Sequence, residues 1–255
     1  MKAIIVAAGR GRRLGHETAD IPKCMVSVGN RPIIEWQLAA LRAAGVDDVV
    51  IVRGYLGDRI RAPGARFVEN PAWQTNNILA SLFHAEGEME DGFLFSYSDI
   101  VFAPDTAKRL AASTGDVALV VDRRWAETYE GRMLHPVGEA ELARVEEIQA
   151  GGLRITRVGK QAVPATEAAG EFIGLAKFSA AGASALRRAW TTALARGLDT
   201  PYGLAPTLRT AYVTDALNDI ASTGTDLVPV FTEGRWREID TEEDLARAHA
   251  VVSTW

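Results

Sequence analysis

A glycine-rich loop with three arginines follows the first apolar segment of the chain. Residues 3–8 read AIIVAA, and residues 9–15 read GRGRRLG. Glycines let backbone N–H groups approach phosphate oxygens, and arginines offset the phosphate charge. Residues 1–23 hold five basic and two acidic side chains, a local charge of +3, whereas the whole chain has −5. These features predict a phosphate site; the alternative is an ordinary strand-to-helix turn with surface arginines.

Two aspartates follow segments that we predict to be strands. Asp99 comes after Phe93–Tyr97, and Asp240 comes after Trp236–Ile239. Ligands of parallel sheets gather at the carboxyl ends of strands, and Mg²⁺ binds one or two carboxylates together with phosphate oxygens. The pair therefore predicts a metal site with Mg²⁺ as the cofactor. The alternatives are a turn or cap role for Asp99 and a helix N-cap role for Asp240.

Apolar runs alternate with amphipathic segments up to residue 122. The predicted strands are Ala3–Ala7, Asp48–Arg53, Arg66–Glu69, Phe93–Tyr97 and Val117–Asp122, and the predicted helices are Pro32–Ala44, Asn76–Glu86 and Pro104–Ala112. Strands that are apolar throughout are covered on both faces, as in parallel sheets. The alternation predicts the α/β class, with a Rossmann-like, doubly wound and mostly parallel sheet.

The pattern changes after residue 122. A small hairpin is predicted from Arg144–Gln149 and Leu153–Val158, around the turn Ala150-Gly151-Gly152. The other predicted elements are strands at Glu171–Phe178, Leu227–Phe231 and Trp236–Ile239 and helices at Ala181–Ala195, Thr214–Thr223 and from Thr241. With no repeat or linker, we predict one domain over residues 1–255, with a phosphate-binding half (about 1–122) and a substrate-side half (about 123–255).

Composition excludes several classes of protein. The 255 residues are 47% hydrophobic and 24% charged, which is ample for an ordinary core. The single cysteine excludes an internal disulfide and fits a reducing compartment, so we expect a cytoplasmic location. No apolar run reaches the ~18 residues of a membrane span. The acidic net charge argues against a nucleic acid, so we expect neither a membrane nor a nucleic acid as partner.

The complete string around the glycine-rich loop is more specific than the loop alone. It reads A-x-x-x-A-A-G-x-G-x-R and is followed by Pro-Lys, which resembles the signature of the nucleotidyltransferases that make NDP-sugars and CDP-alcohols. The matching residues are Ala7, Ala8, Gly9, Gly11, Arg13, Pro22 and Lys23. One departure is visible, because many relatives carry Pro-Leu-Thr where this chain has Gly15, His16, Glu17 and Thr18. The resemblance implies the fold of the nucleotide-diphospho-sugar transferases.

Further segments narrow the resemblance to one branch. The asparagine-rich segment Glu69–Leu82, the SYSDI string at 96–100, the Gly170–Leu175 strand and the terminal W-x-E-I-D-x-x-E-D-L at 236–245 look like those of the phosphocholine cytidylyltransferases. That branch includes cytidylyltransferases for 2-aminoethylphosphonate and hydroxyalkylphosphonates. The likeness spans nearly the whole chain and is loose over residues 123–165.

The resemblance implies a reaction that needs no side-chain nucleophile. An acceptor phosphate or phosphonate oxygen attacks the α-phosphorus of a nucleoside triphosphate, and pyrophosphate leaves, so the protein supplies positioning and charge. Lys23 would bridge the α-phosphate and the acceptor phosphate, Arg13 would hold the β- and γ-phosphates, and Asp99 and Asp240 would hold Mg²⁺. The residues implied for the nucleotide are Ala7, Ala8, Gly9, Gly11, Arg12, Gly54, Asn77, Ser81 and Ser98. The alternative is that Asn76 is an N-cap and Ser81 a helix-face serine.

The acceptor is the least specified part of the site. A choline-like head favours aromatic faces and a primary ammonium favours carboxylates, and residues 122–130 with Glu171 supply both kinds. We predict acceptor contacts by Trp125, Tyr129 and Glu171. Lys160, after the hairpin, is positioned like a second lysine that the resembled superfamily uses on the acceptor phosphate, so the resemblance implies an acceptor contact for it too. The alternative for each is a surface or packing role. The four histidines lack metal-ligand spacing and are interpreted as surface or packing residues.

Three functions remain open. The first is a CTP-dependent cytidylyltransferase for a small phosphoalcohol or phosphonate, and the second is a sugar-1-phosphate nucleotidyltransferase using UTP, dTTP or GTP. The third, a nucleotide-sensing module without activity, is disfavoured because Lys23, Asp99 and Asp240 are all present. The expected partners are CTP or another NTP and a small phosphate-bearing acceptor, with the oligomeric state left open.

Overall fold

The computed structural model describes residues 1–148 and 151–253. Its strands are β1 (Lys2–Ala7), β2 (Ser27–Val28), β3 (Arg31–Pro32), β4 (Asp48–Arg53), β5 (Arg66–Glu69), β6 (Phe93–Tyr97), β7 (Ile100–Phe102), β8 (Val117–Asp122), β9 (Glu141–Glu147), β10 (Leu153–Lys160), β11 (Gly170–Phe178), β12 (Leu227–Thr232) and β13 (Trp236–Glu238). Its α-helices are α1 (Ile33–Ala43), α2 (Ile78–Leu82), α3 (Pro104–Ala112), α4 (Trp125–Tyr129), α5 (Ala180–Leu194), α6 (Val213–Ser222) and α7 (Glu242–Val252).

A nine-stranded sheet forms the centre of the molecule. Its main path runs β10-β9-β11-β6-β1-β4-β5, and β8 and β12 extend it from β11. The β1 pairs with β4 and β6 are parallel, as are β4 with β5 and β8 with β12. Strand β11 runs antiparallel to β6, β8 and β9, so among these strands only β11 and β10 point the opposite way. The sheet is mostly parallel, as the sequence predicts.

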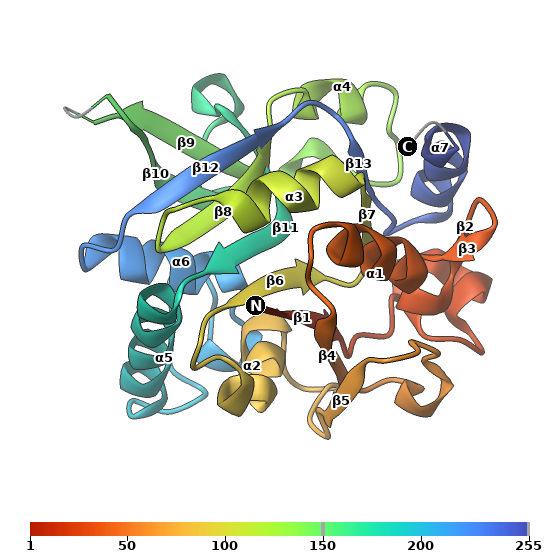
Figure 1. The fold of residues 1–255 in the computed structure, drawn as a ribbon, viewed down its shortest axis with the longest axis horizontal. Coiled ribbons are helices and arrows are strands. Elements are labelled where there is room, and N and C mark those ends of the chain that lie inside the picture. The colour runs from red at the N-terminus through yellow and green to blue at the C-terminus, as the bar shows by residue number, and fades with distance from the viewer. Residues whose placement is uncertain (149–150, 254–255) are drawn as a thin grey trace.

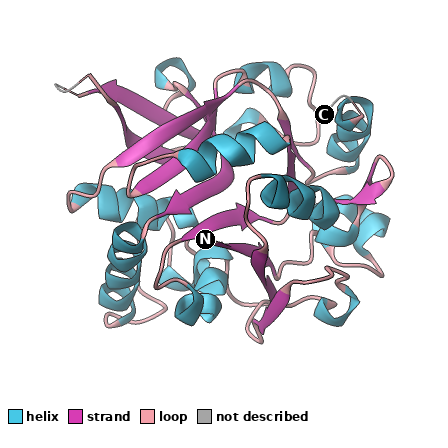
Figure 2. Cartoon of the chain, viewed as in Figure 1, coloured by secondary structure: helices cyan, strands magenta, loops and turns pink. Residues whose placement is uncertain are grey.

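Helices cover both faces of this sheet (Figure 1, Figure 2). Alternate β1 residues point to opposite faces, because side chains alternate along a strand. Ile5 packs with α1 and α3 residues such as Leu38 and Leu110, whereas Ile4 packs with residues of α2, α5 and α6. Burial of side chains on both faces explains why the central strands are mostly apolar, although β6 includes the buried Ser96.

The predicted elements agree closely with the structure in position. Strands β4, β5, β6 and β8 and helix α3 have the predicted bounds, and α1, α5, α6 and α7 differ by one or two residues. The α/β class and the hairpin strands β9 and β10 are confirmed, although Ala150 of the predicted turn lies outside the described residues. Strands from both halves of the chain pair within one sheet; the division near residue 122 stays a prediction.

Several elements differ from the prediction. The short strands β2 and β3 and the helix α4 were not predicted. The predicted helix Asn76–Glu86 is α-helical only over Ile78–Leu82 and continues as a 3₁₀ segment, in which Ala85 leaves helical geometry. Strand β7 was not predicted, because its three residues follow Asp99 without a turn signal. It pairs antiparallel with β13. Asp99 directly precedes β7, and Asp240 follows β13 by two positions, so this small sheet brings the two predicted metal aspartates together.

Candidate active site

The glycine-rich loop lies at the carboxyl end of β1, where a glycine is required by geometry. Gly11 has φ +66°, and a Cβ atom on it would lie 2.9 Å from the Lys23 side chain. A larger residue would therefore be strained and would also displace Lys23. The Thr18 hydroxyl donates to the Gly11 carbonyl oxygen at 3.0 Å, which ties the loop to the segment that leads into Lys23.

The pairing of β7 with β13 places the two aspartates side by side. Glu238 is opposite Ile100, and the Ile239 amide donates to the Asp99 carbonyl oxygen at 2.8 Å. Lys23 Nζ donates to Asp99 Oδ2 at 2.7 Å and also to Asp240 Oδ1. One ammonium nitrogen therefore joins the two carboxylates that the sequence predicts as a pair.

Charge compensation dominates the electrostatics of this cluster. Burial by itself would lower the pKa of Lys23, but Asp240 and Asp99 outweigh it and hold that pKa above its usual value. Burial would raise the pKa of Asp240, yet Lys23 and Arg13 hold it below its ordinary range. The Arg13 guanidinium donates to Asp240 Oδ2. Lys23 and Asp240 therefore both stay charged near neutral pH, as a site for phosphates and a metal would require.

The carboxylates also suit a magnesium ion. Asp99 Oδ1 is buried and has no hydrogen-bond partner among the described residues, so it could accept a further cation. Its Oδ2 atom and Asp240 Oδ1 already converge on one positive nitrogen. Carboxylate oxygens are the donors that Mg²⁺ prefers. Asp99 and Asp240 are thus the residues that would hold it.

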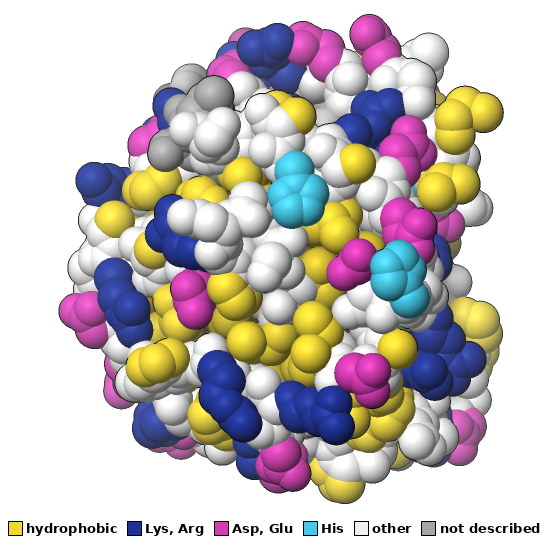
Figure 3. Space-filling model, turned by 90° about the vertical axis from the view of Figure 1, so that its right-hand side faces the viewer, with side chains coloured by type: hydrophobic (Ala, Val, Ile, Leu, Met, Phe, Trp, Pro, Cys, Tyr) yellow, Lys and Arg dark blue, Asp and Glu magenta, His cyan; other side chains and the backbone are white. Residues whose placement is uncertain are grey.

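A cleft of about 230 Å³ extends from these aspartates across the carboxyl ends of the strands. Figure 3 views the side of the molecule toward which β1 and β6 point, and charged side chains there surround a hollowed area with hydrophobic atoms exposed. Seven predicted site residues line the cleft: Arg13, Asn77, Ser98, Asp99, Lys160, Glu171 and Asp240. Glu139 pairs with Lys160 at 2.9 Å and lies 4.0 Å from Arg13, so it links the two cations across the cleft.

Three glutamates also line the cleft: Glu141, Glu171 and Glu238. A carboxylate oxygen of Glu238 lies within 4.8 Å of one of Asp240. Burial raises the pKa of Glu141 to about 7 and that of Glu171 to about 8, and burial together with Asp240 raises the pKa of Glu238. Tyr97 and Tyr129 donate to Glu141 and Glu171 at 3.0 and 2.7 Å. Glu171 Oε2 has no partner among the described residues. These three carboxyl groups can accept hydrogen bonds or a positive charge from a ligand.

The raised pKa of Glu171 makes folding stability depend on pH. The carboxyl of the unfolded chain titrates near about 4.3, so the folded state holds its proton more tightly. Its contribution is complete below that pH and is lost as the pH rises through about 8. We expect Glu171→Gln to stabilise the protein by a few kcal/mol at about pH 9 and little at about pH 4. Urea unfolding at both pH values measures this; an equal change at both would contradict it.

Ten predicted site residues are not among those that line the cleft. Six lie in or beside the glycine-rich loop, namely Ala7, Ala8, Gly9, Gly11, Arg12 and Lys23, and four lie elsewhere. Trp125 is buried against Ala140, Leu142 and Val163, so its indole packs under α4. Tyr129 reaches the cleft only through its hydrogen bond to Glu171. Ser81 is buried in a hydrogen-bond network with Asn70 and Asn76, and Gly54 packs against Ala8 and Trp73. The geometry supports structural roles for these four residues, and their substrate contacts stay predictions.

Sequence reasoning missed several residues of the site. Glu238 could have been found, because it lies two positions before Asp240 on an extended segment, where alternate side chains share a face. Glu139, Glu141 and Tyr212 line the cleft, but they come from segments without a motif. His135 was interpreted as a surface or packing residue; it is 1% exposed and lies 3.8 Å from Asp240.

The sequence of this chain is similar to those of known proteins. Residues 3–171 match the model of the MobA-like NTP transferase domain. The chain belongs to this family. The CTP:phosphoglutamine cytidylyltransferase of Campylobacter jejuni is 33% identical over 190 residues, which cover 70% of this chain and 73% of that protein. The choline-phosphate cytidylyltransferase of Streptococcus pneumoniae is 33% identical over 118 residues, 45% and 52% of the two chains. These relatives confirm the predicted nucleotidyltransferase family and its cytidylyltransferase branch.

Similar solved structures confirm the fold. The CTP:phosphocholine cytidylyltransferase of Streptococcus pneumoniae superposes with a TM-score of 0.71 at 20% identity, covering 98% of each chain. The inositol-1-phosphate CTP transferase of T. maritima gives 0.72 at 21% identity and covers 99% of this chain and 94% of that one. Among the described residues of this nucleotidyltransferase, no helix has the length and apolar character needed to span a membrane.

Proposed function

We propose that this nucleotidyltransferase is a Mg²⁺-dependent cytidylyltransferase that joins CTP to a small phosphoalcohol or phosphonate and releases pyrophosphate. The distribution of charge in one cleft carries the proposal. Lys23 and Arg13 pair with the two aspartates, and the buried Glu141 and Glu171 line the same cleft. A ligand that carries both a phosphate and a positive or hydrogen-bonding group matches this combination of charges.

The reaction requires charge and alignment from the chain rather than proton transfer. A phosphate monoester has a second pKa near about 6 and is therefore largely ionised at neutral pH, so the attacking oxygen needs no side-chain base. Lys23 would neutralise charge where the acceptor phosphate meets the α-phosphate, and Arg13 would neutralise charge on the leaving pyrophosphate. Mg²⁺, held by Asp99 and Asp240, would supply Lewis-acid stabilisation of the phosphates.

The acceptor in this proposal carries an ammonium group. Glu141 and Glu171 have raised pKa values because burial disfavours their charged forms. A cation bound beside them would reverse that cost and hold them ionised. The names of two relatives support an amine-bearing acceptor: the choline-phosphate cytidylyltransferase and a 2-aminoethylphosphonate cytidylyltransferase of Lancefieldella rimae, which is 37% identical over 98 residues covering 36% of this chain and 40% of that one.

One observation favours a second candidate function. The glucose-1-phosphate thymidylyltransferase of Streptomyces griseus aligns with 99% of this chain at 25% identity and is itself covered to 66%. Sugar hydroxyls could donate to the same glutamates that would accept an ammonium. A sugar-1-phosphate nucleotidyltransferase using UTP, dTTP or GTP is therefore the alternative.

Pyrophosphate release separates the two candidates. The purified protein would be assayed with CTP, UTP, GTP and dTTP against phosphocholine, 2-aminoethylphosphonate, a hydroxyalkylphosphonate and hexose-1-phosphates. We expect turnover with CTP and an amine-bearing acceptor, and loss of turnover in EDTA. Preference for a hexose-1-phosphate with another NTP would replace the first candidate by the second.

A cytoplasmic location of the protein stays a prediction.

Removal of the Glu171 charge should change acceptor selection. We expect Glu171→Gln to raise KM for an ammonium-bearing acceptor about 5- to 30-fold, similar to losing a charged hydrogen bond, with a smaller change for a hydroxyalkylphosphonate. KM for CTP should stay nearly constant. Glu127→Gln is the matched control, because that glutamate pairs with Arg124 on the surface of α4. Equal losses for both acceptors would remove Glu171 from acceptor recognition.

A further inference from the structure

The end of α4 and the segment that follows it dock on the N-terminal part of α7 through three separate contacts. Glu243 accepts from the Met133 and Leu134 amides at 2.8 Å each. Arg247 donates to the Thr128 and Glu130 carbonyl oxygens at 3.1–3.3 Å. The third contact is a buried ion pair between Arg132 Nε and Asp244 Oδ1 at 2.6 Å. Of the three contacts, this one involves the residue that also binds the Asp240 backbone.

Asp244 connects this ion pair to the backbone of Asp240. It is the N3 residue of the capping box of α7, and its Oδ2 atom accepts from the Asp240 and Thr241 amides at 3.1 and 2.9 Å. The Thr241 hydroxyl accepts from the Asp244 amide in return. One carboxylate therefore binds Arg132 with one oxygen and fixes the Asp240 backbone with the other. A cap alone would satisfy the helix amides without needing a buried arginine.

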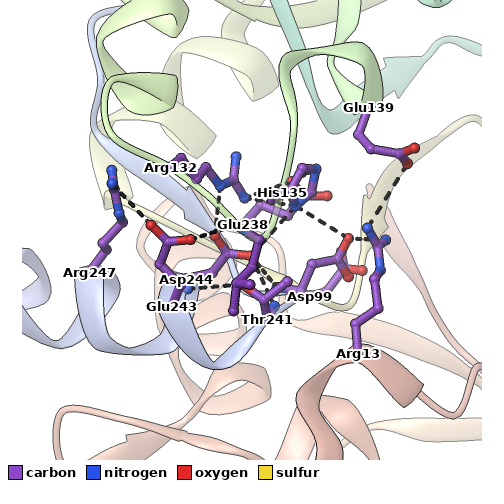
Figure 4. Close-up of polar contacts among 12 residues, drawn as sticks. Arg13, Asp99, Arg132, His135, Glu139, Glu238, Thr241, Glu243, Asp244 and Arg247 are labelled. Carbon is purple, nitrogen blue, oxygen red and sulfur yellow. Dashed lines mark hydrogen bonds and ion pairs between the residues drawn. The ribbon is translucent and has the colours of Figure 1, made fainter.

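His135 fills the space between Asp244 and the cleft. Its Nδ1 atom lies 2.9 Å from Arg132 Nη2, 3.5 Å from Asp244 Oδ2 and 3.8 Å from Asp240 Oδ2. Its Nε2 atom lies 3.5 Å from Glu238 Oε2. The ring therefore lies beside Asp240 Oδ2, whereas Lys23 binds Oδ1. Arg132 contacts the same ring (Figure 4).

We propose that Arg132, His135 and Asp244 are positioning residues that hold the Asp240 carboxylate in its working orientation. The inference rests on the proposed function, in which Asp240 holds the metal. Lys23 and Arg13 bind the two oxygens of Asp240. The His135 ring contacts Asp240 Oδ2, and Asp244 fixes the Asp240 amide. Groups that orient a metal ligand from behind commonly change metal affinity or activity by 10- to 100-fold.

Arg132→Lys tests this proposal, because lysine keeps the charge but cannot bind Asp244 and His135 together as the planar guanidinium does. Arg247→Lys is the matched control, since Arg247 ties the same segment to the same helix without touching Asp244. Calorimetry of CTP binding over a Mg²⁺ titration gives a readout that needs no acceptor. We expect Arg132→Lys to raise the Mg²⁺ half-saturation about 10-fold and to lower kcat similarly, with acceptor KM changed less than about 2-fold. Arg247→Lys should match the wild type.

Two variants at His135 keep the test independent of one substitution. His135→Gln retains a donor and an acceptor, so its Mg²⁺ half-saturation and kcat should stay near the wild-type values. His135→Leu should change both as Arg132→Lys does, at similar thermal stability. Wild-type Mg²⁺ half-saturation and kcat in Arg132→Lys would overturn the proposal, and so would equal losses in Arg132→Lys and Arg247→Lys, which would indicate docking of the segment alone. Failure of the wild type to bind CTP at any Mg²⁺ concentration would instead overturn the proposed function.

Discussion

Lys23→Ala is expected to lower kcat by about 10²–10³-fold, the usual effect of removing one preorganised electrostatic contact. Lys23 is the buried cation that joins Asp99 and Asp240, and in the proposed reaction it meets two phosphates. Steady-state pyrophosphate release with saturating CTP and acceptor measures the change. A purified variant with nearly wild-type kcat would remove Lys23 from the mechanism.

The structure adds a second expectation for the same variant. Without the ammonium, Asp99 loses its ion pair and Asp240 keeps the one with Arg13, so the folded state should lose stability at neutral pH. Added Mg²⁺ should recover more of the melting temperature in Lys23→Ala than in the wild type, because an ion that binds only the folded state stabilises it. Lys2→Ala is a control, since Lys2 pairs with Glu88 on the surface. Equal Mg²⁺ effects in all three proteins would argue against an ion between the aspartates.

Asp99→Asn and Asp240→Asn are each expected to abolish measurable turnover and to weaken Mg²⁺-dependent CTP binding. Each substitution keeps the side-chain volume but removes the charge that a hard cation requires. The loss should reach at least about 10³-fold, because charge stabilisation by a metal contributes several kcal/mol to phosphoryl-transfer chemistry. Full wild-type activity in excess EDTA would contradict the metal role of both residues.

The two aspartate variants should differ in the absence of metal. Asp240 binds both Lys23 and Arg13, whereas Asp99 binds Lys23 only. Asp240→Asn should therefore destabilise the metal-free protein more than Asp99→Asn, as thermal unfolding in EDTA would measure. Asp105→Asn supplies the control, because Asp105 is a half-exposed residue of α3 whose partner is Arg109. An equal loss in both site variants would show that Arg13 contributes nothing to holding Asp240.

Local sequence determined the glycine-rich loop and the positions of the central strands. The loop is set by neighbouring residues, since Gly11 must adopt φ +66° and leave room for Lys23 twelve positions later. Strands β4 and β8 are continuous apolar runs bounded by polar residues, and β6 is apolar except for Ser96 and Tyr97, so hydrophobic runs alone indicate where these strands lie. The capping box Thr241–Asp244 likewise marks where α7 begins.

Tertiary structure decided which side chains share the cleft. Trp125 has the residue type of an acceptor contact, yet it is buried, because Ala140, Leu142 and Val163 of a later segment cover its indole. Residue type cannot reveal this, since an aromatic ring suits a packed core as well as a ligand. Conversely, Glu141 and His135 come from segments without a motif and enter the site through contacts between distant segments.

The same distinction holds at Asp240. Its position after a strand and before a capped helix follows from residues 236–245, because strand ends and helix caps depend on near neighbours. Its partners come from Arg13, Lys23 and His135, which lie more than a hundred residues earlier in the chain. Sequence therefore determined that this carboxylate stands at the edge of a sheet. Only the tertiary structure decided which charges surround it, because electrostatic interactions depend on distance in space rather than on separation along the chain.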